Sequence, residues 1–209
     1  MSFGKHEETA LRALAQTHAL KSGSHFELLS GRHASVFIDM GKILLQNGNL
    51  SELARLLTLE VIERHPESAP PIEMVVAPCG EAHALARAIA NEFHPPRAWV
   101  VPTHAHDGLF VFDEIAGAQI KNKHVLIVDD VSTSGGTLRR LAYAVHERGG
   151  EVVARAALWV RDPRAETEVI GLIHRELTTW DCDTCPLCKQ NMPLDRKSPT
   201  REIPIQQIL

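Results

Sequence analysis

The feature that most constrains the fold is an alternation of short apolar segments with helical stretches, which begins near residue 49. The apolar segments occupy residues 74–77, 98–101, 124–128 and 152–160. Stretches of helical periodicity separate them, including a leucine-containing stretch capped by Asn49 or Ser51 and an alanine-rich stretch that ends before Pro95. Continuously apolar strands connected through helices are typical of a parallel sheet covered on both faces. We therefore predict an α/β fold with a central, mostly parallel sheet flanked by helices.

The segments on either side of this core predict smaller additions to it. A helix is expected at about residues 7–20, and two short strands at 25–29 and 35–38 predict an antiparallel ribbon. Residues 102–119 show little helical periodicity, and we expect a mobile flap with a short hairpin there. The chain of 209 residues is expected to form one domain, with the N-terminal helix and ribbon at 1–45, the α/β core at 46–175 and a cysteine-containing C-terminal arm at 176–209.

Charge and hydropathy exclude some classes of partner. The 22 Lys and Arg against 26 Asp and Glu give a net charge of −4, and no block of like charge runs along the chain. A general nucleic-acid-binding surface is therefore not expected, because such a surface must neutralise phosphates. No stretch approaches the ~18 consecutive apolar residues of a membrane span. We expect a cytoplasmic protein that acts without membrane or nucleic acid.

The strongest chemical signal follows the apolar segment that ends at Val128. Asp129 and Asp130 stand at the carboxyl end of that expected strand, where ligands bind in open α/β sheets. Hydroxyl residues and two glycines then fill 132–137, a run whose backbone N–H groups can surround a phosphate before a helix begins. The loop has neither the Gly-Lys-Ser/Thr of a Walker A motif nor GxGxxG. Two carboxylates beside a phosphate cradle suit a ribose 5-phosphate, whereas the simpler alternative is a turn in which Asp and Ser act as caps.

This window resembles the phosphoribosyl-pyrophosphate (PRPP) motif of the type I phosphoribosyltransferases, which has four apolar residues, two acids and a Thr/Ser-Gly-Gly-Thr/Ser loop. Residues 26–33 with Phe37 are similar to the N-terminal ribbon of the orotate phosphoribosyltransferases, and the tail at 185–188 is similar to one found in a subset of them. Residues 78–82 would be the equivalent of the pyrophosphate loop. The resemblance spans about residues 10–195.

The resemblance implies a set of roles and partners. The ribose hydroxyls would bind Asp129 and Asp130, and Phe37, Thr133 and Arg161 would contact the base, with Arg161 able to fork onto a carboxylate. The full set implied for PRPP is Asp129, Asp130, Val131, Ser132, Thr133, Ser134, Gly135, Gly136, Thr137, Cys79 and Gly80. The implied reaction is Mg²⁺-dependent transfer of the phosphoribosyl group from PRPP to a base, foremost orotate to give orotidine 5′-monophosphate in pyrimidine biosynthesis. A homodimer is implied as well.

The sequence departs from the family where pyrophosphate would bind. Leu29 stands where a lysine commonly precedes Ser-Gly, Glu81 lies in the pyrophosphate-loop equivalent, and no lysine occurs between Lys42 and Lys121, although the family places a catalytic lysine in the flap. His104 and His106 are candidate catalytic cations in its place, or plain surface residues. Two alternatives to orotate transfer therefore stay open. They are transfer to another base, and a PRPP- or nucleotide-sensing regulatory protein without turnover.

The cysteines form a second candidate constellation. Cys182, Cys185 and Cys188 follow one another at CxxC spacing and could bind Zn²⁺, with Cys79 or His174 as a fourth ligand. Free or packing thiols and a redox pair are the alternatives.

Overall fold

A computed structural model of the chain describes residues 5–16, 19–28, 30–44, 47–78, 80, 82–104, 108–162 and 168–195. Its centre is a five-stranded sheet in the order β4-β3-β7-β8-β9, in which every neighbouring pair is parallel. The strands are β3 (Met74–Val76), β4 (Ala98–Val100), β7 (His124–Ser132), β8 (Glu151–Val160) and β9 (Ile170–His174). The predicted α/β fold with a parallel sheet is confirmed.

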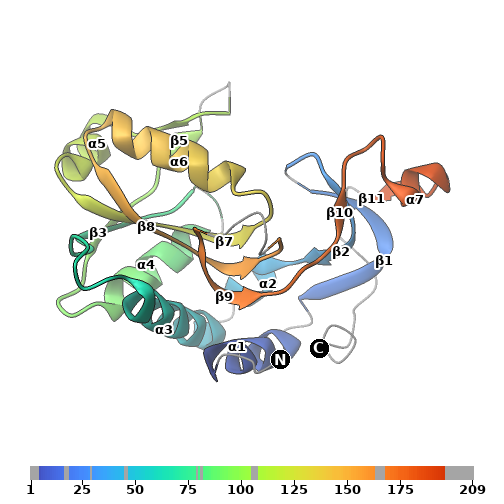
Figure 1. Ribbon diagram of the computed structural model, residues 1–209, viewed down its shortest axis with the longest axis horizontal. Helices are drawn as coiled ribbons and strands as arrows, with labels where there is room; N and C mark the ends of the chain where they lie inside the picture. Colours follow the sequence, from blue (N-terminus) through green and yellow to red (C-terminus); the bar gives the residue numbers. More distant parts are fainter. Residues whose placement is uncertain are drawn as a thin grey trace.

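Helices cover both faces of this sheet (Figure 1). On one face lie α1 (Lys5–Gln16), α3 (Asn47–Arg64) and α4 (Ala82–Glu92), and on the other lie α5 (Glu114–Ile120) and α6 (Gly136–Glu147). Strand β7 contributes side chains to the core on both faces of the sheet, because successive side chains of a strand point to opposite faces. Leu126 and Val128 belong to the cluster with α3 and α4, whereas Val125 and Ile127 belong to the cluster with α6. This double burial explains the continuous apolar run in the sequence.

A smaller sheet, in the order β10-β2-β1-β11, stands beside the core (Figure 1). The predicted ribbon is its centre, formed by β1 (Leu20–Glu27) antiparallel to β2 (His33–Ile38). The C-terminal arm adds β10 (Thr179–Trp180) to one edge and β11 (Leu194–Asp195) to the other, with α7 (Pro186–Lys189) between them. Because two strands of the C-terminal arm pair with the N-terminal ribbon, these two segments share one sheet.

Several boundaries differ from the sequence predictions. The N-terminal helix ends at Gln16 and not near residue 20, and the predicted break at 22–24 lies inside β1, where Gly23 has a φ of 79° and the pairing register shifts. A bulge accommodates this glycine without ending the strand. Helix α3 begins at Asn47, ahead of both predicted caps, and the short α2 (Met40–Leu44) was not predicted.

The segment that follows β4 contains the predicted hairpin, formed by β5 (Thr103–His104) antiparallel to β6 (Phe110–Val111). The sequence did not predict α5, which begins after Asp113, whose side chain accepts a 2.8 Å hydrogen bond from the N–H of Ala116. Helix α5 has only seven residues, too few for a hydrophobic period to be recognised. Among the described residues, no helix combines the length and apolar character that a membrane span requires.

Candidate active site at the carboxyl edge of the sheet

Strand β7 brings Asp129 and Asp130 to the carboxyl edge of the parallel sheet. Asp129 is buried and Asp130 is half-buried. The Asp129 carboxylate accepts a 2.9 Å hydrogen bond from the N–H of Asp130, and the Asp130 carboxylate accepts one of 2.6 Å from the N–H of Val131. The backbone therefore holds both carboxylates in fixed positions where a ligand of the sheet would bind.

Burial raises the pKa of both carboxyls. For Asp129 the effect of burial is largest, and the charge of the neighbouring Asp130 raises its pKa as well. Because burial disfavours the charged form of both carboxyls, a ligand that supplies hydrogen-bond donors or a cation would stabilise their negative charges. Ribose hydroxyls supply the first and Mg²⁺ the second, because Mg²⁺ prefers oxygen ligands.

The loop that follows leads directly into the N-terminus of α6. Gly135 is the N-cap residue and adopts a φ of 66°, a left-handed conformation that glycine adopts without steric cost. No side chain caps the helix, so its first N–H groups and its positive dipole end face the loop. Thr133 and Thr137 are half-buried and Ser134 is exposed, which leaves hydroxyl donors beside these N–H groups. This arrangement suits a phosphate.

Arg140 is a cation beside the loop that the sequence analysis did not assign to it. A Cβ atom placed on Gly136 would lie 3.6 Å from an Nη1 atom of Arg140 and 3.5 Å from Oγ of Ser134. The guanidinium of Arg140 therefore lies over the first turn of α6. The signal was present in the sequence, because Arg140 stands four residues after Gly136 and so on the same face of the helix.

Arg161 follows β8 and links the loop to the ribbon. Its backbone N–H donates a 2.9 Å hydrogen bond to the carbonyl of Ser132. Its side-chain Nη2 donates hydrogen bonds of 3.1 Å to the carbonyl of Val36 and of 3.5 Å to the carbonyl of Leu177. The side chain is buried, which lowers its pKa to about 10, so the guanidinium stays charged at neutral pH. Its Nε is buried without a hydrogen-bond partner among the described residues. A carboxylate ligand would suit this buried charge.

The predicted base-binding residues lie around the same edge. Phe37 follows Val36 in β2, is half-buried, and packs against Phe26 with 5.8 Å between ring centroids. Arg161 thus connects the strand of Phe37 with the loop that contains Thr133. The structure brings these three predicted positions to one region although they are far apart in the sequence.

The other predicted contacts are described only in part. Gly80 lies in the turn between β3 and α4 with a φ of 91°, and a Cβ atom placed on it would meet no described atom within 4 Å. Because β3 and β7 are parallel neighbours, this turn shares the edge that holds Asp129. His104 is in β5 opposite Phe110, but its side chain, like all of Cys79 and His106, lies outside the described residues. Their predicted roles stay predictions.

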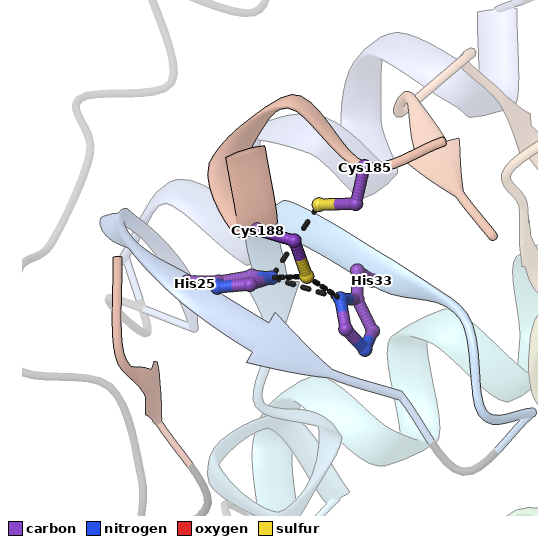
Figure 2. A group of neighbouring side chains, drawn as sticks. All are labelled: His25, His33, Cys185 and Cys188. Carbon is purple, nitrogen blue, oxygen red and sulfur yellow. Dashed lines mark hydrogen bonds between the residues drawn. The ribbon is translucent and has the colours of Figure 1, made fainter. Parts of the chain in front are cut away.

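A second cluster lies in the smaller sheet (Figure 2). Cys185 and Cys188 meet His25 and His33, and one ligand atom of each lies within 4.8 Å of the others. Cys182 is exposed and lies near Cys188. The pKa of Cys188 is raised to about 11, first by burial and then by the neighbouring thiols of Cys185 and Cys182.

Of the two fourth ligands expected for the cysteines, Cys79 lies outside the described residues, and His174 lies apart from the cluster. His174 is in β9, where its Nε2 accepts a 3.0 Å hydrogen bond from the N–H of Gly171, away from the cluster. The sequence analysis missed His25 and His33, and the register of the ribbon explains their meeting. Phe26 pairs with Ala34, so both histidines point to the other face and are diagonal neighbours there.

Comparisons with known proteins identify the family of the chain. The phosphoribosyl transferase domain family matches residues 41–181. The orotate phosphoribosyltransferase of Caldicellulosiruptor bescii is 27% identical over 194 residues, which cover 90% of this chain and 95% of that protein. The orotate phosphoribosyltransferase of Pelotomaculum thermopropionicum is 30% identical over 190 residues, covering 85% and 90%.

The fold is also found in solved structures. The orotate phosphoribosyltransferase of Mycobacterium tuberculosis in complex with inorganic phosphate matches with a TM-score of 0.61 at 20% identity, over 81% of this chain and 96% of that one. The same enzyme in complex with PRPP matches with a TM-score of 0.58 at 18% identity, over 82% and 90%. The chain therefore belongs to the phosphoribosyl transferase domain family, as a type I phosphoribosyltransferase of the orotate phosphoribosyltransferase-like kind.

Proposed function

We propose that this protein transfers the phosphoribosyl group of PRPP to orotate, giving orotidine 5′-monophosphate and pyrophosphate in pyrimidine biosynthesis. The observation that carries the proposal is the pair of adjacent carboxylates, buried Asp129 and half-buried Asp130, followed by the uncapped N-terminus of α6. The names of the similar proteins support the choice of orotate. The proposal treats the whole chain as one domain that acts as a homodimer in the cytoplasm.

The ribose and its phosphate would bind at the end of β7. Asp129 and Asp130 accept hydrogen bonds from the two ring hydroxyls, and the N–H groups and hydroxyls of residues 132–137 donate to the 5-phosphate. Arg140 adds a positive charge at the same loop. These contacts fix the anomeric carbon relative to the base, which is where most of the rate enhancement in this kind of reaction arises.

The base would lie between the loop and the ribbon. Arg161 donates to the carboxylate of orotate, Thr133 contacts the ring, and Phe37 packs against its face. The buried charge of Arg161 and its unpartnered Nε among the described residues support this assignment. Uracil has the same ring without the carboxylate, so it leaves this charge unpaired, and the site is expected to discriminate strongly against it.

The reaction is a displacement at the anomeric carbon. A ring nitrogen of orotate forms a bond to that carbon while the bond to pyrophosphate breaks, and the proton of the nitrogen passes to solvent. Mg²⁺, when bound with PRPP, supplies positive charge to the leaving pyrophosphate, and the carboxylate oxygens of Asp129 and Asp130 suit this ion. The β5–β6 hairpin would cover the site and exclude water, and His104 and His106 would contribute charge in place of the lysine of the family.

Release of pyrophosphate from PRPP tests the proposal. With Mg²⁺ present, we expect release that depends on orotate and is absent with uracil or adenine. Asp129→Asn should lower it strongly, and Glu52→Gln, at an exposed carboxylate on α3, should leave it unchanged. No release with orotate from protein that still binds PRPP would refute orotate transfer.

The absence of lysine between Lys42 and Lys121 favours a second candidate, a protein that senses PRPP without turnover. That candidate predicts saturable PRPP binding and no pyrophosphate release with any base. A panel of pyrimidine and purine bases separates it from transfer to a base other than orotate.

A further inference from the structure

We infer that His25, His33, Cys185 and Cys188 form a structural Zn²⁺ site that fixes the C-terminal arm to the N-terminal ribbon. The four side chains come from β1, from β2 and from α7 with its N-cap residue Cys185, and Figure 2 shows them converging. Two imidazoles and two thiolates are a common ligand set of structural zinc. The site lies in the smaller sheet, apart from the carboxyl edge at which PRPP would bind, so the inference does not depend on the proposed reaction.

The distances between the ligand atoms match a tetrahedral ion. Zn–N bonds of about 2.05 Å and Zn–S bonds of about 2.3 Å at tetrahedral angles place N and S atoms about 3.6 Å apart and two N atoms about 3.3 Å apart. Sγ of Cys185 lies 3.4 Å from Nε2 of His25, and Sγ of Cys188 lies 3.8 Å from the same nitrogen and 3.2 Å from Nδ1 of His33. The two nitrogens are 2.9 Å apart. An ion fits after shifts of a few tenths of an ångström.

Hydrogen bonding alone does not account for this convergence. Nδ1 of His25 lies 2.8 Å from the carbonyl of Met192, which can only accept, so Nδ1 carries the proton. In the neutral ring, Nε2 then has one lone pair, yet Nδ1 of His33 and the thiols of Cys185 and Cys188 all approach it. One lone pair accepts one good hydrogen bond, whereas a metal ion satisfies all four groups together. The Met192 carbonyl is also the kind of partner that orients a metal-bound histidine.

Burial and charge favour the same conclusion. His25, His33 and Cys185 have exposed fractions of 1%, 3% and 0%. Two thiolates and two neutral imidazoles around Zn²⁺ sum to zero charge, so the occupied site is compatible with this burial. The cysteines are held at the required spacing because Cys185 is the N-cap residue of α7 and the N–H of Lys189 donates back to its carbonyl.

The arm needs such a fixed point. Its strands β10 and β11 have two residues each, and pairing of that length stabilises little without other contacts. The four ligands join residues 160 positions apart in the chain, His25 and Cys185. Binding of zinc would therefore hold both edges of the ribbon, including the strand that carries Phe37.

Metal analysis of the full chain tests the inference. Protein purified without a metal-affinity tag or chelator should contain about one zinc per chain by mass spectrometry of the metal. Cys185→Ser and His25→Asn should lose most of this zinc. Cys182→Ser, which removes an exposed thiol from the same CxxC run, is the matched control and should keep it.

A second measurement covers the case in which a ligand variant fails to fold. Wild-type protein stripped of metal is titrated with Co²⁺, whose absorption reports thiolate bonding and tetrahedral geometry. We expect saturation at one ion per chain with both signatures, in wild type and in Cys182→Ser. Three results would overturn the inference: no thiolate bands with Co²⁺ together with no zinc in the purified protein, equal loss of zinc from Cys182→Ser and Cys185→Ser, or a disulfide between Cys185 and Cys188 in protein kept from oxidants.

Discussion

Replacing Arg161 with methionine separates a role in binding the base from a role in the fold. Methionine keeps an unbranched side chain but has no N–H donor. In the structure the guanidinium donates to Val36 at 3.1 Å and to Leu177 at the longer 3.5 Å, and its Nε has no partner among the described residues. The substitution therefore removes one good structural hydrogen bond and every donor available to a carboxylate.

The two effects differ in size. The loss of the donor to the Val36 carbonyl leaves a partly buried acceptor without its partner, which lowers the free energy of unfolding by about 1–3 kcal/mol. Loss of the buried charge offsets part of that cost, because burial already disfavours the charged form and lowers the Arg161 pKa to about 10. A melting temperature lower by roughly 2–8 °C is expected for a chain of this size. A charge-assisted hydrogen bond is worth about 1.5–3 kcal/mol, so a two-bond fork to orotate loses at least about 3 kcal/mol, roughly 150-fold in kcat/KM.

Steady-state kinetics and calorimetry together test this prediction. Arg161→Met should lower kcat/KM for orotate roughly 100-fold or more while the Kd for PRPP, measured by calorimetry without base, changes less than about threefold. Arg155→Met is the control, because Arg155 is on β8, the strand that Arg161 follows, but pairs with Glu168 at the surface. It should retain both constants.

An Arg161→Met variant that retains orotate kcat/KM within about threefold of wild type would refute this role of Arg161. Parallel loss of orotate and PRPP binding in both variants would also contradict it, since that pattern indicates a general loss of structure. A gain in the relative use of uracil by Arg161→Met would support the assignment further.

Three other substitutions address the phosphoribosyl site. Asp129→Asn should weaken PRPP binding roughly 10- to 100-fold in calorimetry. The same variant should raise the melting temperature near neutral pH. Burial raises the Asp129 pKa, so the native carboxylate lowers stability as pH rises through that pKa, and the gain should vanish in acid, where Asp129 is protonated. Arg140→Gln should weaken PRPP binding with a smaller salt dependence, whereas Arg55→Gln, an exposed arginine on α3, should not. Gly135→Ala should cost about 1–2 kcal/mol of stability, seen in urea unfolding, because its φ is 66°, and Ser134→Ala should cost less.

Local patterns accounted for the elements that the sequence predicted well. The sequence alone located β7, its two aspartates and the start of α6 because all of them lie within residues 124–137 and depend on neighbouring residues. The short hairpin predicted within residues 102–119 was local in the same sense. Strand β9 was missed because it is a five-residue edge strand interrupted by Gly171, which weakens both its periodicity and its strand propensity.

What the sequence by itself determined is the strand-loop-helix unit that identifies a phosphoribosyl site, since apolar periodicity and glycine conformation act over a few residues. Only the tertiary structure decided which distant groups meet, such as Arg161 with Val36 and the histidines of the ribbon with Cys185 and Cys188. Those meetings depend on strand register and on packing between the ends of the chain. No local pattern encodes them, because their free energy arises from contacts across about 125 to 160 residues of intervening chain.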